Sequence, residues 1–543
     1  MKEYLRNKLQ TAINIFASNI DKTIILEKPR QPEHGDLTTN IAMMTARRLG
    51  KNPRQFAQEL VDKLNLDSTY VDKVEIAGPG FINFRFTNKY FFEQLSGILK
   101  NSSNYGKVNI GEGKKTQVEF VSANPTGPLT VGHGRGAVLG DTIANLLEWT
   151  NHNVTREYYF NNTGRQMRIL GESVRLRYLE LTGEEIDFPD DYYRGEYIKE
   201  IAQHLVNEYG DSLKQNSDEE VFKLRAEQEI FDDIKRTLKR LTIEFGVFFN
   251  EKSLYDDGSI DKVIKDFRNK DLAYDQDGAV WFKASVFGGE KDKVIVKSTG
   301  EPTYRLPDIA YHRNKFQRGF ELIVDLLGAD HVATYPDVLA GVKALGYDGK
   351  KVKVLIHQFV TIVQNGEVVK MSTRKANFIT LDELIDEVGA DVVRYFFLMR
   401  SMDSHLNFDL GLAKTQSDEN PVYYLQYAHA RITSIIRYAE SEGVDITVPA
   451  NLNLLDKNEE IDLIKHLEQF PDMIESCTVA YEPHRLAEYL HVVAGLFHKF
   501  YHQHRVVTED KQLTAARIVL CLATKIVLKN GFAILGITAP EKM

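Results

Sequence analysis

The segment VEFVSANPTGPLTVGHGRGAVLGD, residues 118–141, constrains the fold of this chain more than any other stretch. It begins as a short apolar strand, passes through a loop rich in proline and glycine, and continues as a helix with apolar residues such as Leu139 and Ile143 on one face. Strands that alternate with helices in this way are typical of a parallel α/β sheet. Because the alternation continues to about residue 410, we expect an α/β parallel-sheet domain over residues 113–410.

The regions on either side have a different pattern. Residues 1–112 combine an amphipathic first helix, a helical stretch from Ile41 to about Leu64, and a half-buried strand in VEIAGPGFINFRF, which predicts a small α+β domain. After about Asp418 the strand patterns stop, and residues 411–543 predict an all-α helical bundle. The chain has 543 residues, which leaves room for such a multidomain arrangement at ~100–200 residues per domain.

Composition excludes several classes of protein. No uninterrupted apolar run approaches the ~18 residues of a membrane-spanning helix, and the N-terminus predicts an amphipathic helix instead of a signal peptide. Only Cys477 and Cys521 occur, so we expect neither disulfides nor a cysteine-rich zinc site, and a reducing cytoplasm fits. The net charge of −9 argues against a generally basic surface but allows one local basic groove.

The loop before the helix at 131–149 has the features of a nucleotide site. His133 lies where that helix begins, and a helix N-terminus attracts phosphate through its free N–H groups and its dipole. Gly127, Gly132 and Gly134 would allow the backbone to approach a nucleotide closely. The alternative is that these glycines only build a tight connection between strand and helix.

A second loop carries three cations. Asn365-Gly366 predicts a hairpin turn, and the segment after it, EVVKMSTRKANF at residues 367–378, places Lys370, Arg374 and Lys375 on a turn. Three cations suit a polyphosphate whose charge must be neutralised while its bond breaks. The alternative is an ordinary solvated basic turn.

Together the two loops resemble the HIGH and KMSKS motifs of class I aminoacyl-tRNA synthetases. Here the motifs are Thr130-Val131-Gly132-His133 and Lys370-Met371-Ser372-Thr373-Arg374. The closer resemblance is to arginyl-tRNA synthetases, and it runs in order along the whole chain. It is carried by HGDLTTNIAM, AGPGFINFRF, EFVSANPTGPL, REYYFNNTGRQM, TYRLPDIAYH, LLGADH, KMSTRKANFITLDEL, GADVVRYFFLMRS and NPVYYLQYAHARI. Thr130 and Thr373 depart from the family pattern, where a histidine and a lysine are usual.

The resemblance implies an arginine–tRNA ligase. Such an enzyme joins L-arginine to ATP, releases pyrophosphate, and transfers the arginyl group to the 2′-hydroxyl of the terminal adenosine of its tRNA. The implied fold has a tRNA-binding α+β domain at 1–112, a Rossmann-like class I catalytic domain with an inserted segment at 113–410, and a DALR-type helical anticodon-binding domain at 411–543. Relatives commonly need bound tRNA before they activate arginine, and we expect the same here.

The resemblance also implies the binding residues. Arginine would be held by Glu119, Asn124, Tyr304 and Asp308, with the guanidinium paired to Asp308; the alternative for Asp308 is a carboxylate on a helix surface. The residues implied for ATP are Gly132, His133, Gly328, Asp330, Lys370, Met371 and Ser372, and those implied for catalysis are His133, Lys370 and Arg374. Mg²⁺ is expected as the counter-ion of ATP, without a metal site of the protein's own.

For tRNA the expected contacts are Tyr423, Tyr427 and Arg431, whose rings and charge suit unstacked bases, although tyrosines at this spacing also occur in cores. Asp391-Val392-Val393-Arg394 resembles the family's junction motif before the anticodon domain. We expect a cytoplasmic protein, a monomer, with no membrane partner. Two other interpretations stay open: a small-molecule nucleotidylyltransferase, and a catalytically impaired synthetase-like RNA-binding or regulatory protein.

Overall fold

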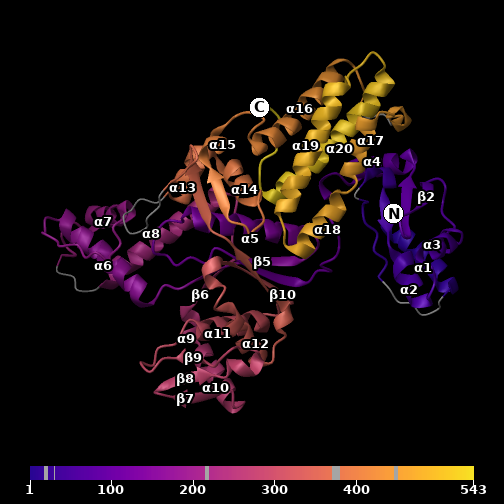
Figure 1. Cartoon of the computed structure of the whole chain (residues 1–543). Coiled ribbons are helices and arrows are strands. Elements are labelled where there is room, and N and C mark those ends of the chain that lie inside the picture. The colour runs from indigo at the N-terminus through magenta and orange to yellow at the C-terminus, as the bar shows by residue number, and fades with distance from the viewer. Residues whose placement is uncertain (17–22, 30, 215–218, 370–378, 446–449) are drawn as a thin grey trace. The chain divides into compact units, whose positions relative to one another are not determined.

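The computed structural model describes residues 1–16, 23–29, 31–214, 219–369, 379–445 and 450–543. Its contacts divide the chain into two compact units, whose elements can be followed in Figure 1. The first unit comprises residues 1–105, 431–470 and 495–527, and the second comprises residues 106–430, 471–494 and 528–543.

The first unit contains a small antiparallel sheet of order β1-β3-β2 with helices beside it. Its N-terminal elements are α1 (Lys2–Phe16), β1 (Leu37–Thr39), α2 (Ile41–Leu49), α3 (Pro53–Val61), β2 (Val71–Ala77), β3 (Phe81–Phe86) and α4 (Asn88–Asn101). The apolar face predicted for the first helix is confirmed, since Leu5, Leu9 and Ala12 of α1 are buried. This α+β region packs on α17 (Asn458–Leu467), and the Lys465 ammonium lies 2.7 Å from a carboxylate oxygen of Asp36.

The structure divides two of the elements expected in this region. The helical stretch expected from Ile41 to about Leu64 consists of two helices, because Gly50 ends α2 in the left-handed conformation and Asn52 caps α3 by accepting the N–H groups of Arg54 and Gln55. The single strand expected in VEIAGPGFINFRF is a hairpin, in which β2 and β3 pair antiparallel. Gly80, with φ of +132°, lies in its turn, where an added Cβ would come within 2.9 Å of the Pro53 carbonyl oxygen.

The second unit contains a five-stranded parallel sheet, which confirms the α/β prediction. Its strand order is β11-β10-β4-β5-β6, and every neighbouring pair is parallel. The bounds are β4 (Lys115–Glu119), β5 (Asn153–Phe160), β6 (Val247–Asn250), β10 (Leu322–Gly328) and β11 (Val352–His357). Helix α5 (Val131–Trp149) follows β4 and is buried on nearly every side, not only on the apolar face that we expected. Gly140 makes this possible, because a Cβ there would lie 2.2 Å from the Phe120 ring.

Two groups of elements are inserted between the strands of this sheet. The first group is helical and consists of α6 (Gly164–Leu181), α7 (Glu196–Tyr209) and α8 (Glu219–Arg240), with α6 packed against both α7 and α8 (Figure 1). The second group shares a core that includes Phe267, Phe282 and Leu306. It consists of α9 (Lys252–Asp256), α10 (Ser259–Asn269), β7 (Ala273–Gln276), β8 (Ala279–Phe282), β9 (Lys293–Val296), α11 (Arg305–Gln317) and α12 (Tyr335–Leu345).

The segment KVKVLIHQFVTIV, residues 351–363, is divided between two sheets. Its first half is β11, whereas β12 (Val360–Gln364) pairs with β13 (Glu367–Val368) and β14 (Leu406–Asp409). The predicted hairpin turn is confirmed, with positive φ at both Asn365 and Gly366. Thr380 and Glu383 form a capping box at the start of α13 (Leu381–Val388), since the Glu383 N–H donates to Thr380 Oγ1 and the Glu383 carboxylate accepts the Thr380 N–H.

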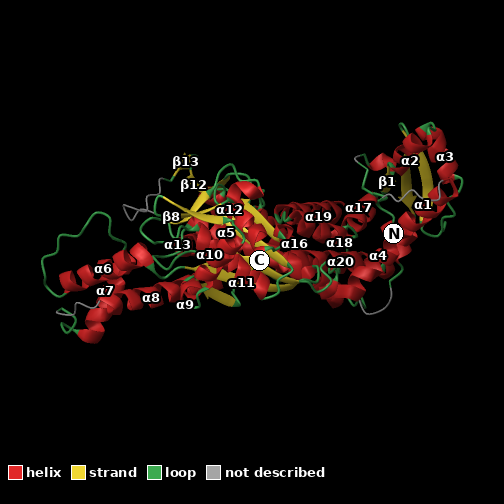
Figure 2. Cartoon of the chain, turned by 90° about the horizontal axis from the view of Figure 1, so that it is seen from below, coloured by secondary structure: helices red, strands yellow, loops and turns green. Residues whose placement is uncertain are grey.

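The C-terminal region is helical, as predicted. After α14 (Ala390–Leu398) and α15 (Leu410–Lys414) come α16 (Pro421–Ser441), α17, α18 (Phe470–Ala480), α19 (His484–Gln503) and α20 (Lys511–Leu535), drawn red in Figure 2. Within the described residues, α20 alone is long and apolar enough to cross a membrane by length and composition, which the sequence analysis did not expect. However, 67% of its most apolar window is buried inside the structure, as in a core helix.

Candidate functional site

The candidate site residues gather where the strands of the parallel sheet end. Glu119 is the last residue of β4, Asn161 follows β5, and Glu251 follows β6. On the other side of β4, Gly328 ends β10 opposite His357, which ends β11. Ligands of parallel α/β sheets bind at this edge of the sheet, so the strand order itself brings these five residues to one place.

The turn after β4 adopts a strained backbone. Val121 and Ser122 have φ of +66° and +45°, a conformation that is rare for a β-branched residue such as valine. The Ser122 hydroxyl donates to Glu119 Oε1 at 3.1 Å and accepts the Tyr159 N–H at 3.2 Å. Strain of this kind persists where surrounding bonds hold it, and it is common at functional sites. Here it fixes the Glu119 carboxylate at the strand end.

Three carboxylates, Glu119, Glu251 and Asp308, are near enough in this region for the charges of the first two to act on the third. Burial raises the pKa of Asp308 to about 7; among the charges around it, His312 acts to lower that pKa, whereas Glu119 and Glu251 raise it further. Burial raises the pKa of the Tyr159 hydroxyl, and the charges of the same three carboxylates raise it further. The hydroxyl therefore lies near all three. A region with three carboxylates and raised proton affinity is suited to a cationic ligand.

Glu251 is a member of this cluster that the sequence analysis missed. Its carboxylate is buried and accepts hydrogen bonds from the Tyr159 hydroxyl at 2.7 Å and from Asn161 Nδ2 at 2.9 Å. The Tyr255 hydroxyl lies 3.3 Å from the same carboxylate. Its position directly after a strand of the parallel sheet was the signal that could have found it.

Lys315 pairs with Glu119 of this cluster, and the sequence analysis missed it as well. Its fully buried ammonium donates to Glu119 Oε2 at 2.6 Å and to Asp325 Oδ1 at 2.7 Å, while His312 Nε2 lies 2.8 Å from the other Asp325 oxygen. Burial alone would lower the pKa of Lys315, but Asp325 and Glu119 more than compensate and raise it. The spacing of Asp308, His312 and Lys315 on α11, four and then three residues apart, places them on one helix face and was the available signal.

The N-terminus of α5 carries His133 beside Asp330. The Thr130 N–H donates to His133 Nδ1 at 3.2 Å, which leaves Nε2 as the nitrogen that carries the proton in the neutral ring. Burial lowers the pKa of His133, and the charge of Asp330 opposes this. His133 is therefore a neutral hydrogen-bond donor near pH 7, at a helix end that favours anions.

His357 completes this second group of residues. Burial lowers its pKa to about 4, with Arg135 and His133 acting in the same direction and Asp330 against it. An added Cβ at Gly136 would lie 2.9 Å from His357 Nε2, so this glycine lets the imidazole rest on α5. The sequence analysis missed His357, although it too ends a strand. The structure thus brings His133, Gly328 and Asp330 into one region and adds His357.

The remaining predicted residues have different surroundings. Asn124 accepts the Asn161 N–H at 3.0 Å and donates to Gln166 at 3.1 Å, which ties the loop after β4 to the residues after β5. Tyr304 is the residue before the first turn of α11, and its side chain is 88% exposed. Lys370, Met371, Ser372 and Arg374 lie outside the described residues, as does Thr373.

The tyrosines expected to contact tRNA lie on α16. The rings of Tyr423 and Tyr427 are parallel to within 8°, with centroids 6.3 Å apart, and both are partly buried. The Arg431 guanidinium lies over the Tyr501 ring, 5.5 Å from its centroid.

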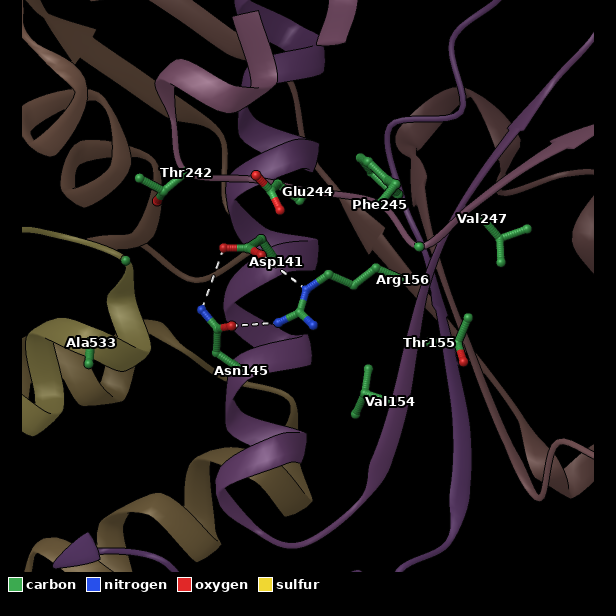
Figure 3. Close-up of a pocket in the computed structure, with 12 residues that line it drawn as sticks. Asp141, Asn145, Val154, Thr155, Arg156, Thr242, Glu244, Phe245, Val247 and Ala533 are labelled. Atoms are coloured by element: carbon green, nitrogen blue, oxygen red, sulfur yellow. Dashed lines mark hydrogen bonds and ion pairs between the residues drawn. The ribbon is translucent and has the colours of Figure 1, made fainter. Parts of the chain in front are cut away.

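A pocket of about 800 Å³ lies at the opposite edge of the parallel sheet, at the amino ends of β5 and β6 (Figure 3). The Arg156 side chain points into it and is already paired, donating to Asn145 Oδ1 at 2.6 Å and to Asp141 Oδ1 at 3.2 Å. None of the sequence-predicted site residues lines this pocket. The candidate site is therefore the carboxyl edge, where the functional side chains converge.

Family models match three successive parts of the chain. The model of the arginyl-tRNA synthetase N-terminal domain matches residues 1–86, and that of the catalytic domain of class I tRNA synthetases (R) matches residues 94–395. The model of the DALR anticodon-binding domain matches residues 425–543. The three matches follow the order expected from the sequence motifs.

Similar proteins of full length are also found. An arginine–tRNA ligase of Desulfotalea psychrophila is 53% identical over 95% of this chain and 94% of its own length. One of Salinibacter ruber is 50% identical over all of both chains. Among solved structures, the arginyl-tRNA synthetase of Thermus thermophilus superposes with a TM-score of 0.77 at 20% identity over all of both chains.

Proposed function

The chain belongs to the arginyl-tRNA synthetase family, and from this premise we propose that it is an arginine–tRNA ligase that works at the carboxyl edge of its parallel sheet. The arginine carboxylate attacks the α-phosphate of ATP, and pyrophosphate leaves. The 2′-hydroxyl of the terminal adenosine of tRNA then takes the arginyl group and releases AMP. The cluster of Glu119, Glu251 and Asp308 is the observation that carries this proposal, because it is a partly buried anionic site that suits a guanidinium.

We assign arginine recognition to this carboxylate cluster. A guanidinium has five N–H donors in a fixed fork, and carboxylates accept them in strong, directional pairs. Asp308 and Glu251 are the acceptors for that fork, since the charges of both act on the Tyr159 hydroxyl, which donates to Glu251 at 2.7 Å. Glu119, held by Ser122 and Lys315, is the partner for the α-ammonium group. Asn124 and Tyr304 remain proposed contacts at the edge of the pocket.

We assign ATP to the group around the N-terminus of α5. His133 donates from Nε2 to a phosphate oxygen, and the N–H groups of the first helical turn, including that of Gly132, add to the attraction. Gly328 and Asp330 lie at the end of β10, where they would contact the ribose and adenine side. Lys370, Met371, Ser372 and Arg374 are proposed to meet the departing pyrophosphate.

Mg²⁺ would arrive with ATP, held mainly by phosphate oxygens and water. The exposed carboxylate of Asp330 is an oxygen donor of the type that this ion accepts. The ion would neutralise charge on the phosphates, while His133 and the helix N-terminus orient them.

The wider organisation is also proposed. We assign residues 1–112 and 411–543 to tRNA binding, with Tyr423, Tyr427 and Arg431 among the contacts, and residues 113–410 to the chemistry. We propose a monomer in the cytoplasm without a membrane partner; both cysteines are buried free thiols, which suits a reducing compartment.

Incubation with labelled arginine, ATP and bulk tRNA tests the activity. We expect alkali-labile arginyl-tRNA, which neither a small-molecule nucleotidylyltransferase nor an inactive RNA-binding relative would form. Failure to charge any tRNA, with the chain folded and able to bind tRNA, would favour the inactive relative.

Glu251→Gln tests the arginine pocket specifically. Because a buried charged partner is lost, we expect the KM for arginine to rise on the order of 10- to 1,000-fold, with the KM for ATP little changed. The matched control is Asp256→Asn, which removes an exposed carboxylate of α9 that pairs with Lys252. An unchanged KM for arginine in Glu251→Gln would remove this residue from the pocket.

A further inference from the structure

Arg135, at the start of the second turn of α5, is a fully buried cation without a carboxylate partner among the described residues. Its guanidinium donates instead to three backbone carbonyl oxygens, those of Gln358 at 2.8 Å, Ser404 at 2.9 Å and Ser401 at 2.9 Å. Its Nε–H group is buried without an acceptor in the part of the chain that the structure describes. Arginine is almost never fully buried unless it is paired, so this side chain is unusual.

The stability of the fold does not explain this arginine. Burial lowers its pKa to about 10, and the exposed Asp403 opposes this only in part. A buried charge without a charged partner and a buried donor without an acceptor each cost free energy of folding. Arg394, which also contacts α5, has the Asp141 carboxylate at 2.7 Å and lacks this cost. The unpaired charge of Arg135 therefore indicates a function that needs a cation at this place.

The three bonds of Arg135 join α5 to the small sheet of β12, β13 and β14. Gln358 lies between β11 and β12, and the loop that contains Ser401 and Ser404 leads into β14. The two loops are also joined to each other, since the Gln358 N–H donates to the Met402 carbonyl oxygen at 2.9 Å. Arg135 therefore fixes the start of the small sheet on the helix.

The small sheet leads to the residues proposed for pyrophosphate. Its strand β13 ends at Val368, and Lys370 follows two residues later in the sequence. On the far side of that segment, the Leu381 N–H donates to the Leu129 carbonyl oxygen at 2.8 Å, just before α5 begins. The described residues on both sides of the segment are thus attached to the N-terminal part of α5, and Arg135 makes the attachment on one side.

The charge of Arg135 also reaches the group of residues assigned to ATP. Burial lowers the pKa of His357 to about 4, with the charge of Arg135 acting in the same direction. The charges of Asp330 and His133 act on the same imidazole, so the field of the guanidinium extends into this group. In surroundings of low dielectric constant, a charge acts over a longer distance than in water. The phosphates of ATP are the anion that would supply the missing countercharge.

We propose that Arg135 is a positioning residue for ATP, which holds the small sheet against α5 and attracts the triphosphate through its unpaired charge. It does not touch the nucleotide, since it is fully buried. The inference rests on the proposed function for the identity of the nucleotide and its place at the carboxyl edge. It adds a residue outside the set assigned to contact ATP. The charge and the three bonds are separate parts of this role, and different substitutions distinguish them.

Direct binding of ATP and of adenosine to the full-length chain, measured by titration calorimetry, tests the charge. We expect Arg135→Met to weaken ATP binding on the order of tenfold, as for the loss of one unit charge about 10 Å away inside a protein. Binding of adenosine, which has no phosphate, should stay unchanged. Arg135→Lys keeps the charge and should keep the ATP affinity within about threefold of wild type.

Exchange of pyrophosphate into ATP, measured with tRNA present, tests the three bonds. The ammonium of a lysine cannot reproduce the planar fork of a guanidinium. We therefore expect kcat to fall on the order of tenfold in Arg135→Lys and on the order of 100-fold in Arg135→Met, because small errors in position slow the reaction strongly. The KM for arginine should stay unchanged in both variants, since the carboxylate cluster is untouched.

Two further variants complete the experiment. Arg156→Gln is the matched control, because it removes a guanidinium that pairs with Asp141 of the same helix at the opposite edge of the parallel sheet (Figure 3). It should lower the melting temperature and leave ATP affinity and kcat unchanged. Asp403→Asn removes the exposed charge that opposes that of Arg135, and it tests the proposal even if Arg135→Met does not fold. It should raise ATP affinity about twofold, a small effect because solvent screens an exposed charge.

Wild-type ATP affinity in Arg135→Met, or equal losses of ATP and adenosine binding in that variant, would overturn the proposal. An ATP affinity of Asp403→Asn at or below that of wild type would do the same. Because nucleotide binding is measured without tRNA, these results stay interpretable if the chain arginylates no tRNA, a result that would count against the proposed function alone.

Discussion

At the scale of single residues, the raised pKa of Asp308 should make arginine binding depend on pH. Its pKa of about 7 means that the carboxylate needed for a guanidinium is only half ionised at neutral pH in the free protein. We therefore expect kcat/KM for arginine to fall about tenfold per pH unit below 7 and to level off above it, since this ratio reports ionisation of the free enzyme. Measuring kcat/KM between pH 5.5 and 8.5 checks this; a profile flat across neutral pH would contradict the role of Asp308.

Asp308→Asn should affect binding and stability in opposite directions. Arginine binding should lose on the order of 2–4 kcal/mol, because the guanidinium loses its charged partner. The folded protein holds Asp308 at a pKa above its ordinary 3.8, so ionisation opposes folding increasingly as the pH rises from about 4 to 7.

The asparagine side chain of Asp308→Asn does not ionise, so the variant lacks the destabilisation that ionised Asp308 causes at high pH. We expect Asp308→Asn to be more stable than wild type by on the order of 2 kcal/mol at pH 8, and no more stable at pH 4, in thermal melts at both pH values. Asp261→Asn, on the exposed face of α10, is the control and should show no such dependence on pH. A variant that is destabilised at pH 8 and still binds arginine would show Asp308 to be structural.

The next prediction at the residue scale concerns His133 and the rate of arginine activation. His133→Ala should slow arginine-dependent exchange of pyrophosphate into ATP by roughly 10²–10³-fold, with a smaller change in the KM for ATP, because the Nε2 donor acts on charge that develops in the transition state. Since burial keeps the ring neutral, its contribution should not be lost between pH 6.5 and 8. Exchange at the wild-type rate in His133→Ala would leave the loop a purely structural one.

At the scale of elements, Arg394 of α14 links three segments of the second unit. Its buried guanidinium donates to Asp141 of α5 at 2.7 Å, to the Leu535 carbonyl oxygen at the end of α20 at 2.8 Å, and to the Leu241 carbonyl oxygen at 2.6 Å. Gly536 makes room for it, since a Cβ there would lie 2.2 Å from the guanidinium.

Arg394→Met would leave these buried acceptors without their donor. We expect it to cost about 3–5 kcal/mol, as for a broken buried ion pair, and to lower the melting temperature of the full chain by several degrees. Adding Asp141→Asn should recover part of the loss, because the buried charge left behind is removed. An Arg394→Met protein that melts like wild type would show that the contacts are not maintained in solution.

At the scale of the whole molecule, we expect activation of arginine to depend on tRNA. With threonine at 130 and 373, two groups that usually organise the phosphates of ATP are absent, and tRNA binding energy would instead close the loop that carries Lys370 and Arg374. Exchange of pyrophosphate should therefore require cognate tRNA, and Thr373→Lys should weaken that requirement. Vigorous exchange by the wild-type chain without tRNA would refute this expectation.

Thr130 also has a local role that the motif comparison alone does not suggest. Its N–H donates to His133 Nδ1, and its carbonyl oxygen accepts the Gly134 N–H, so it begins α5 and sets the tautomer of the histidine. The sequence shows that Thr130 departs from the family motif. Only the geometry at the start of α5 shows what this residue does for His133.

Local patterns in the sequence determined much of this protein. The hairpin turn at Asn365-Gly366, the capping box of α13, the face of α1 and the strand-to-helix loop before His133 each depend on neighbours within a few residues, so the residue types alone predict them. Local patterns also have limits. Gly50 and Asn52 divide the helical stretch expected at 41–64 into two helices, and the segment expected as one strand is the hairpin of β2 and β3.

Only the tertiary structure decided which distant residues meet. Glu251 reaches Glu119 and Asp308 because β6 lies two strands from β4, and His357 reaches His133 because β11 and β10 lie on the other side of β4. Hydrophobic periodicity reports which side of an element is buried, not which strand will lie beside it. Strand order, and the burial of Lys315 between two carboxylates, follow from packing the whole chain, and that packing turns a set of separate motifs into a pocket for a cation beside a site for phosphates.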